Sequence, residues 1–174
     1  MAAPAEVMTK AEMTAALQAF IQGWNDHDVE AIMARAADDV VWENPASAGP
    51  VHGKEAAAAD VTATFATFPD LHFPMEDFRI YTTDDPNVGF TTWTITGTMN
   101  GPLAGMAATG KPARIRGVCV YTFRDGLIAE HTIVLDSLDF VQQLGLIPRE
   151  EDVSHKALAQ LQRLATKTRK ALHV

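Results

Sequence analysis

Asp136 is the residue whose position most strongly indicates chemistry. It follows the apolar run Ile133-Val-Leu135 and comes directly before Ser137, at the end of a predicted strand. By simple alternation its carboxylate shares a strand face with Val134 and Ile128, and burial there would raise its pKa and make it a competent general base. The structural alternative is that Asp136 only caps the next helix by accepting backbone hydrogen bonds. The sequence leaves both roles open.

Other motifs with known chemistry are incomplete. The segment Gly105–Lys111 has the spacing of a phosphate-binding loop, but Pro112 stands where a magnesium-binding Ser or Thr is required. The six histidines share no metal-ligand spacing, so we predict no metal site. The single cysteine, Cys119, is expected to fill the core. No serine lies in a nucleophile elbow.

Aromatic residues could line a ligand cavity, although aromatic residues at core spacing usually belong to the core. The candidates are Trp24, Trp42, Phe65, Phe68, Phe73 and Trp93. Asn44 shares a strand face with Trp42, and an amide beside aromatic rings suits a carbonyl ligand. His131 falls on the strand face opposite Asp136, so we expect a structural or interface role for it.

Hydrophobic periodicity predicts the elements that position these residues. Helices are expected over residues 10–24, 28–36 and 56–68, and strands over 40–44, 71–81, 88–99, 114–123 and 127–136. A capping box from Thr9 to Glu12 opens the first helix, and Arg124-Asp-Gly126 predicts a hairpin turn. Helices followed by a run of antiparallel strands favour an α+β fold over a doubly wound sheet.

Composition limits the class of protein. The chain has 174 residues, 47% of them hydrophobic, and a formal net charge of −8. This size supports one domain without disulfides, and the absence of a leader-like start or a long apolar run predicts a cytoplasmic protein. The negative charge argues against nucleic-acid and membrane binding.

The charge is unevenly distributed. No acid follows Asp152, while five Lys and Arg residues do, so the chain up to Asp152 holds 9 basic against 22 acidic residues. We therefore divide the chain into a domain over residues 1–148 and an amphipathic helical extension over 149–174. The basic extension is expected to dock on the acidic body or on a partner subunit.

An ordered series of motifs resembles the SnoaL-like polyketide cyclase (ester cyclase) family, within the nuclear transport factor 2-like superfamily. The motifs are Phe68-Pro-Asp70, Gly97-Thr-Met-Asn-Gly101, Thr109-Gly-Lys111, Arg116-Gly-Val118, Arg124-Asp-Gly126, Ile128-Ala-Glu-His131, Leu135-Asp136 and Gln143-Leu-Gly145. The resemblance implies a cone-shaped α+β barrel, with a curved antiparallel sheet over three helices and a deep apolar pocket. It also implies ring closure by aldol condensation without metal or organic cofactor, with Asp136 as acid/base.

The sequence departs from this family at several positions. Many relatives have His where this chain has Met99 and Trp where it has Thr132. Positions that face the base are apolar here, as at Val120 and Val134. Polar groups that would hold an enolate are therefore fewer, which favours a different substrate or reaction.

The first hypothesis is an enzyme that acts on a small, largely apolar carbonyl or polyketide-like compound. Asp136 is its expected acid/base, and the expected substrate-binding residues are Trp24, Trp42, Asn44, Phe65, Trp93, Met99, Val120, Thr132 and Val134. Epoxide hydrolysis or isomerisation on the same scaffold is one alternative. A non-catalytic binding or dimerisation module is the other, and a filled core with Asp136 bonded to backbone N–H groups would favour it.

A homodimer is expected through the outer face of the sheet. The last strand is apolar on both faces, so both faces should be covered, one by helices and the other by a second subunit.

Overall fold

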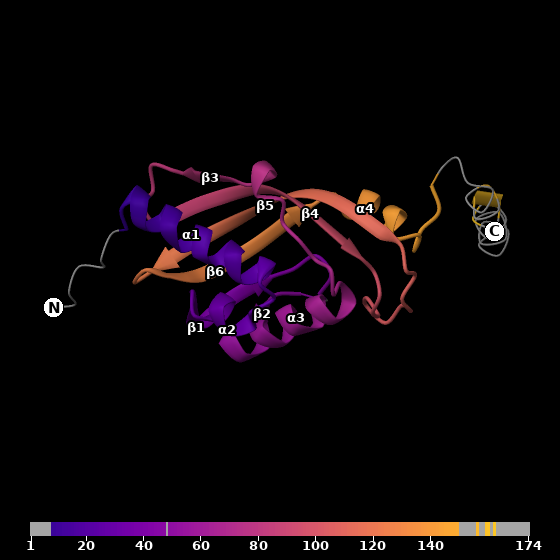
Figure 1. Cartoon of the computed structure of the whole chain (residues 1–174), viewed down its shortest axis with the longest axis horizontal. Coiled ribbons are helices and arrows are strands. Elements are labelled where there is room, and N and C mark those ends of the chain that lie inside the picture. The colour runs from indigo at the N-terminus through magenta and orange to yellow at the C-terminus, as the bar shows by residue number, and fades with distance from the viewer. Residues whose placement is uncertain (1–7, 48, 150–155, 157–158, 161, 163–174) are drawn as a thin grey trace, which may run out of the picture.

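The computed structural model describes residues 8–47, 49–149, 156, 159–160 and 162 (Figure 1). The helices are α1 (Lys10–Asn25), α2 (Val29–Met33), α3 (Lys54–Thr67) and α4 (Ser137–Gln143), with a 3-10 turn at Met75–Asp77. The strands are β1 (Ala36–Glu43), β2 (Val51–His52), β3 (Arg79–Thr82), β4 (Val88–Thr98), β5 (Pro112–Arg124) and β6 (Leu127–Leu135). The predicted α+β class is confirmed.

Helix α1 begins where the capping box predicts. The Thr9 hydroxyl accepts from the backbone N–H of Glu12, and the Glu12 carboxylate accepts from the backbone N–H of Thr9 at 2.8 Å. These two bonds satisfy amides that the first turn would otherwise leave open. The buried face of the helix contains an apolar stripe at helical spacing, which is Met13, Leu17, Phe20, Ile21 and Trp24.

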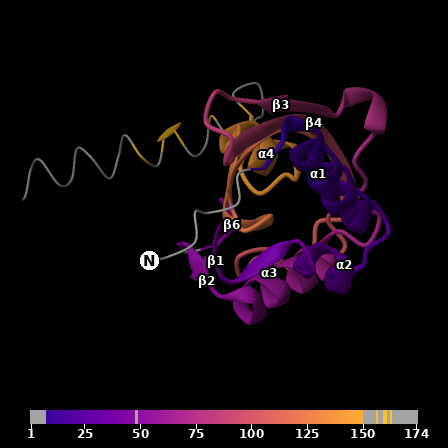
Figure 2. The same cartoon turned by 90° about the vertical axis from the view of Figure 1, so that its left-hand side faces the viewer.

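The six strands form one curved sheet in the order β2-β1-β6-β5-β4-β3. Strands β1 and β6 run parallel, and every other neighbouring pair is antiparallel. Figure 2 shows the sheet curling around α1, with α3 on the far side of the enclosed space. The sheet is open, because β2 and β3 remain separate edges. The expected cone-shaped arrangement is therefore present. The two edge strands do not pair with each other, and helices cover the side that the sheet leaves open (Figure 2).

The strand expected over 71–81 is much shorter in the structure. Only Arg79–Thr82 pairs as β3, while the preceding residues contribute an isolated bridge from His72 to Thr96 and the 3-10 turn. Pro74 precedes that turn and has no N–H to donate to a strand ladder. The short strand β2 was not predicted, because two residues carry no periodicity.

An irregularity in β6 determines which side chains face inward. Thr122 pairs with Glu130, but Phe123 pairs with Ile128, so Ala129 is the extra residue of a bulge. The bulge brings both Ile128 and His131 to the buried side. Simple alternation, which placed Ile128 and Val134 on one face, fails for this reason.

The inner face of the sheet is shaped by one close approach. Gly117 on β5 pairs with Trp93 on β4, and a Cβ at residue 117 would lie 2.4 Å from the indole ring. A glycine at this position therefore lets Trp93 lie against the sheet.

Within the described part of the chain, no helix is both long and apolar enough to cross a membrane. The expected extension over 149–174 lies mostly outside the described residues.

Candidate active site

A cavity of about 230 Å³ lies between α1, α3 and the concave face of the sheet. Its walls come from α1, α3, β4, β5, β6 and the loops after β1 and β4. The described lining residues are mostly apolar, and many are aromatic: Phe20, Trp24, Phe68, Phe73, Trp93, Tyr121 and Phe140. Apolar walls with a few polar groups are typical of small-molecule sites.

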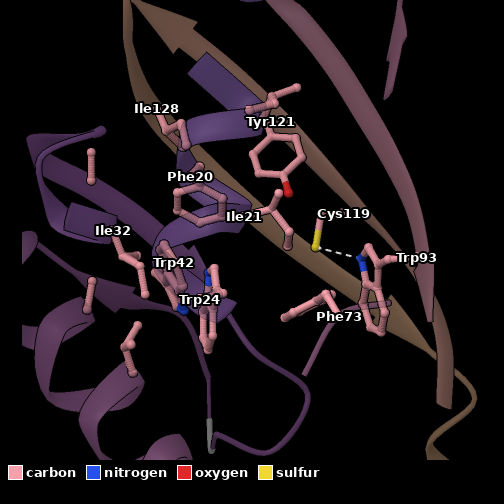
Figure 3. Packing of buried hydrophobic residues seen from close by; sticks show 14 of the residues in the cluster. Phe20, Ile21, Trp24, Ile32, Trp42, Phe73, Trp93, Cys119, Tyr121 and Ile128 are labelled. Atoms are coloured by element: carbon pink, nitrogen blue, oxygen red, sulfur yellow. Dashed lines mark hydrogen bonds between the residues drawn. The ribbon is translucent and has the colours of Figure 1, made fainter. Parts of the chain in front are cut away.

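Aromatic rings pack together at one end of this cavity, and Figure 3 shows three of them, Phe20, Trp42 and Tyr121, from close by. Phe20 packs edge-on against Tyr121 with ring centroids 5.8 Å apart, and it also contacts the rings of Trp42 and His131. All four side chains are at most 2% exposed. We call this end the floor of the cavity, defined by Phe20, Tyr121 and His131, which line it, with Trp42 packed behind them.

His131 is the residue of the floor whose protonation affects the stability of the protein between pH 5 and pH 7. Its imidazole is 2% exposed, and burial lowers its pKa to about 3, since an apolar environment disfavours the charged ring. Of the groups whose rings contact it, Tyr121 is the titratable one, and burial raises the pKa of that phenol well above its usual value. His131 is therefore neutral at physiological pH.

The low pKa of His131 predicts acid sensitivity. The unfolded chain binds a proton at this residue below about pH 6.5, while the folded protein does not until about pH 3. Stability is therefore lost as the pH falls below 6.5, by about 2 kcal/mol from this residue between pH 7 and pH 5. Urea unfolding of the protein and of His131→Phe at both pH values measures this loss. An identical change in the two proteins would contradict the prediction.

A polar cluster lines the cavity on the side of α3. The Asp60 carboxylate accepts from the Ser47 hydroxyl at 2.7 Å and from the Asn44 side-chain amide at 3.0 Å. The Asn44 oxygen in turn accepts from the backbone N–H of Ala46 at 3.0 Å. All three side chains of the cluster are half-buried and line the cavity. Among the described lining residues, Asp60 is the one that carries a carboxylate.

Cys119 also lines the cavity, but its thiol stays protonated. The Trp93 indole N–H donates to its sulfur at 3.1 Å (Figure 3), and burial raises the pKa of the thiol to about 12. Because the thiolate is the reactive form, we expect almost no labelling by iodoacetamide at pH 7.5 in the folded protein. Labelling in urea is the control, since the chain has one cysteine. Fast labelling of the folded protein would contradict this expectation.

Asp136 lies outside the described lining of the cavity. It is exposed and occupies the N-cap position of α4, where its Oδ1 accepts from the backbone N–H of Asp139 at 3.0 Å. Its neighbour Leu135 and the helix residue Phe140 do line the cavity. The capping role is thus present in the structure, while the role of Asp136 as acid/base stays a prediction.

The predicted substrate-binding residues divide into two groups. Trp24, Asn44 and Trp93 line the cavity as expected. Trp42, Phe65 and Met99 do not belong to the described lining. Trp42 and Met99 are fully buried, and Phe65 stacks on His27 with ring centroids 4.4 Å apart.

Three predicted positions lie on the opposite face of the sheet. Val120 and Val134 are 39% and 55% exposed, and Thr132 pairs with Val120 on the same outer side. Their placement in the cavity wall is therefore corrected, since their strand neighbours Tyr121 and Ile133 point inward instead. Alternation counted back from an inward-facing Asp136 put Thr132 and Val134 on the wrong face, and Val120 was placed by the family resemblance.

Sequence reasoning missed two of the polar residues of the cavity. Asp60 lies in an Ala-rich helix and carries no motif, although its spacing of four residues from Thr64 places both on one helix face. His131 was assigned a structural or interface role because it lies on the strand face opposite Asp136, and Asp136 was the residue expected to face the cavity.

The sequence matches the family model for SnoaL-like polyketide cyclases over residues 14–144. The chain belongs to the SnoaL-like polyketide cyclase family. The family provides a scaffold of the cyclase or isomerase type, on which the cavity occupies the space under the curved sheet. Among the described residues, no three His, Cys, Asp or Glu side chains cluster as metal ligands would.

Several solved structures share the fold at low sequence identity. A candidate polyketide cyclase from Xanthomonas campestris pv. campestris is 19% identical, with a TM-score of 0.70 over 78% of this chain and 98% of that one. AclR, a candidate hydroxylase from Streptomyces galilaeus, is 22% identical, with a TM-score of 0.68 over 92% and 98%. TsrD from Streptomyces laurentii is 22% identical, with a TM-score of 0.67 over 80% and 99%. No curated protein matches the sequence.

Proposed function

We propose that this protein is an enzyme that removes a proton from a small, largely apolar carbonyl or polyketide-like compound. The reaction is an aldol-type cyclisation or a related C–H deprotonation that uses a carboxylate and no cofactor. The observation that carries the proposal is the Asp60 carboxylate in the wall of an otherwise apolar cavity, oriented by Asn44 and Ser47. A carbon beside a carbonyl is acidic enough for a positioned carboxylate to deprotonate.

The cavity supports this chemistry in two further ways. Its aromatic and aliphatic walls favour an apolar substrate, and such a substrate would displace water from the lining when it binds. Its fixed shape holds a flexible chain in a folded conformation, which brings two reacting carbons together. The single carboxylate among the described lining residues can take the proton from one carbon and return it to the alkoxide that forms.

Exchange of substrate protons for deuterium tests the proposal without knowledge of the natural substrate. A panel of small aromatic ketones and β-keto esters is incubated in D₂O with the protein, and deuterium beside the carbonyl is measured by mass spectrometry. We expect exchange well above the buffer rate for at least the β-keto esters, whose protons are the most acidic. Exchange at the buffer rate for every compound would overturn the proposed reaction.

The cap geometry of Asp136 favours a second candidate, a non-catalytic binding module. In that case the cavity binds the same apolar compounds without exchanging their protons. Binding measured by calorimetry, together with exchange at the buffer rate, would select this candidate over the enzyme.

We further propose that the protein is a homodimer through the outer face of the sheet. This face exposes Val120, Val134 and Tyr81, the last stacked on Phe90 with ring centroids 4.7 Å apart. Sedimentation is expected to give about twice the chain mass of 18.9 kDa. Val134→Asp should shift the protein to monomer, because it places a charge in an apolar contact. Met106→Asp, in the loop after β4, is the control, and a monomeric wild type would contradict the proposal.

A further inference from the structure

Helix α4 lies along the edge of β5 where β6 ends. The pairing of β6 with β5 stops at Leu135, opposite Gly117, whereas β5 begins at Pro112. In the described part of the chain, no strand therefore pairs with residues 112–116 on the side away from β4. Figure 1 shows α4 beside this first stretch of β5. The backbone groups of this stretch need another partner, because unpaired N–H and C=O groups are costly away from water.

The Gln143 side chain of α4 is that partner. Its Oε1 accepts from the backbone N–H of Arg114 at 2.8 Å, and its Nε2 donates to the backbone oxygen of Arg114 at 3.1 Å. Nε2 also donates to Oδ2 of Asp139, one turn earlier in α4, at 2.7 Å. The backbone N–H can only donate, and the carbonyl and carboxylate oxygens accept, so these bonds fix the orientation of the amide. We call the two bonds between Gln143 and Arg114 the clamp.

The clamp places an aromatic ring at the end of the cavity away from the floor. Phe140 lies on α4, lines the cavity and packs against Phe68, with ring centroids 6.0 Å apart. The lining residues of β5 run from Tyr121 at the floor to Ala113 at this end, roughly 25 Å along the strand. Arg114, which Gln143 holds, is the neighbour of Ala113. The position of Phe140 in the wall therefore depends on how α4 sits on β5.

We infer that Gln143 is a positioning residue that sets the length of the ligand through Phe140. The clamp holds α4 against β5, so the Phe140 ring limits a ligand that extends from the floor along β5. Shorter compounds end before the ring, whereas longer ones require α4 to move away. The substrate class that follows is a short aromatic ketone or β-keto ester, and compounds with long acyl chains are excluded. The role of Gln143 rests on the proposed function for the ligand class alone, since it concerns binding and not proton transfer.

A homologous series of phenyl alkyl ketones tests the length limit. Acetophenone, butyrophenone, hexanophenone and octanophenone share the ring and the carbonyl group and differ in the number of methylene groups. Calorimetry with the whole chain gives the dissociation constant of each ketone. In the wild type we expect about fourfold tighter binding for each added methylene while the chain fits, and weaker binding beyond the limit. Phe140→Ala should move the limit to a longer ketone of the series.

Gln143→Glu tests the clamp at nearly constant side-chain size. The carboxylate can accept from the Arg114 N–H, but it has no proton to donate to the Arg114 oxygen, and it would lie beside the Asp139 carboxylate. At pH 7 we expect the length limit to move in the same direction as in Phe140→Ala, with the affinity for acetophenone close to that of the wild type. Gln142→Glu makes the same charge change at the neighbouring residue of α4 and should keep the wild-type limit.

The outcomes separate the clamp from the proposed function. An unchanged limit in Phe140→Ala would show that this ring does not set the length, and an unchanged limit in Gln143→Glu would overturn the positioning role. Equal weakening of all ketones in Gln143→Glu would overturn it as well, because a general loss of structure affects every probe. In each of these cases the proposed function stands if a β-keto ester still exchanges deuterium in the wild type. Failure of every ketone to bind the wild type would overturn both the ligand class and the length limit.

Discussion

Replacing Asp60 with Asn is expected to lower deuterium exchange on the best β-keto ester by about 10²- to 10⁴-fold, the usual contribution of a positioned general base. Asn keeps the size of the side chain but has no carboxylate to accept a proton. Its amide can still contact Asn44 and Ser47, whose side chains hold the Asp60 oxygens at 3.0 and 2.7 Å. The expected loss therefore reports the proton transfer and not a collapsed cavity.

Two variants make this result interpretable. Glu55→Gln removes a carboxylate from an exposed position of the same helix and should leave exchange unchanged. Asp136→Asn tests the base that the family resemblance implies. If the rate falls in Asp136→Asn and not in Asp60→Asn, then Asp136 is the base and our assignment of Asp60 is wrong. Thermal unfolding of each variant shows whether it is folded.

Much of the fold was predictable because the sequence signals for its helices and turns are local. The capping box at Thr9 and the turn at Arg124-Asp-Gly126 depend on adjacent residues, and both lie where they were expected. The parallel pairing of β1 with β6 joins residues about ninety positions apart, such as Val41 and Glu130, and no local pattern encodes it. The family resemblance provided the architecture that local signals could not.

The site was predicted less well than the fold. A bulge of one residue at Ala129 reverses the facing of side chains in β6, and alternation alone has no means to detect it. Beyond the bulge, Asp136 was expected to face the cavity, so Val134 was placed inward with it and His131, on the opposite face, was not recognised as a cavity residue. Asp60 was missed because a single acid on a helix is usually solvated, and its partners Asn44 and Ser47 come from a distant loop.

Phe20→Ala is expected to have the largest effect on stability, a loss of about 3–5 kcal/mol in the free energy of unfolding. Phe20 is 2% exposed and contacts the rings of Trp24, Trp42 and Tyr121. Removing its ring deletes buried apolar surface and leaves a void that rigid aromatic neighbours cannot fill by small movements. Urea unfolding monitored by circular dichroism measures the loss.

The control for Phe20→Ala lies on the same helix. Gln18 is exposed on α1, and Gln18→Ala should change stability by less than about 0.5 kcal/mol. Phe20 also lines the cavity, so its removal should enlarge the floor beside His131.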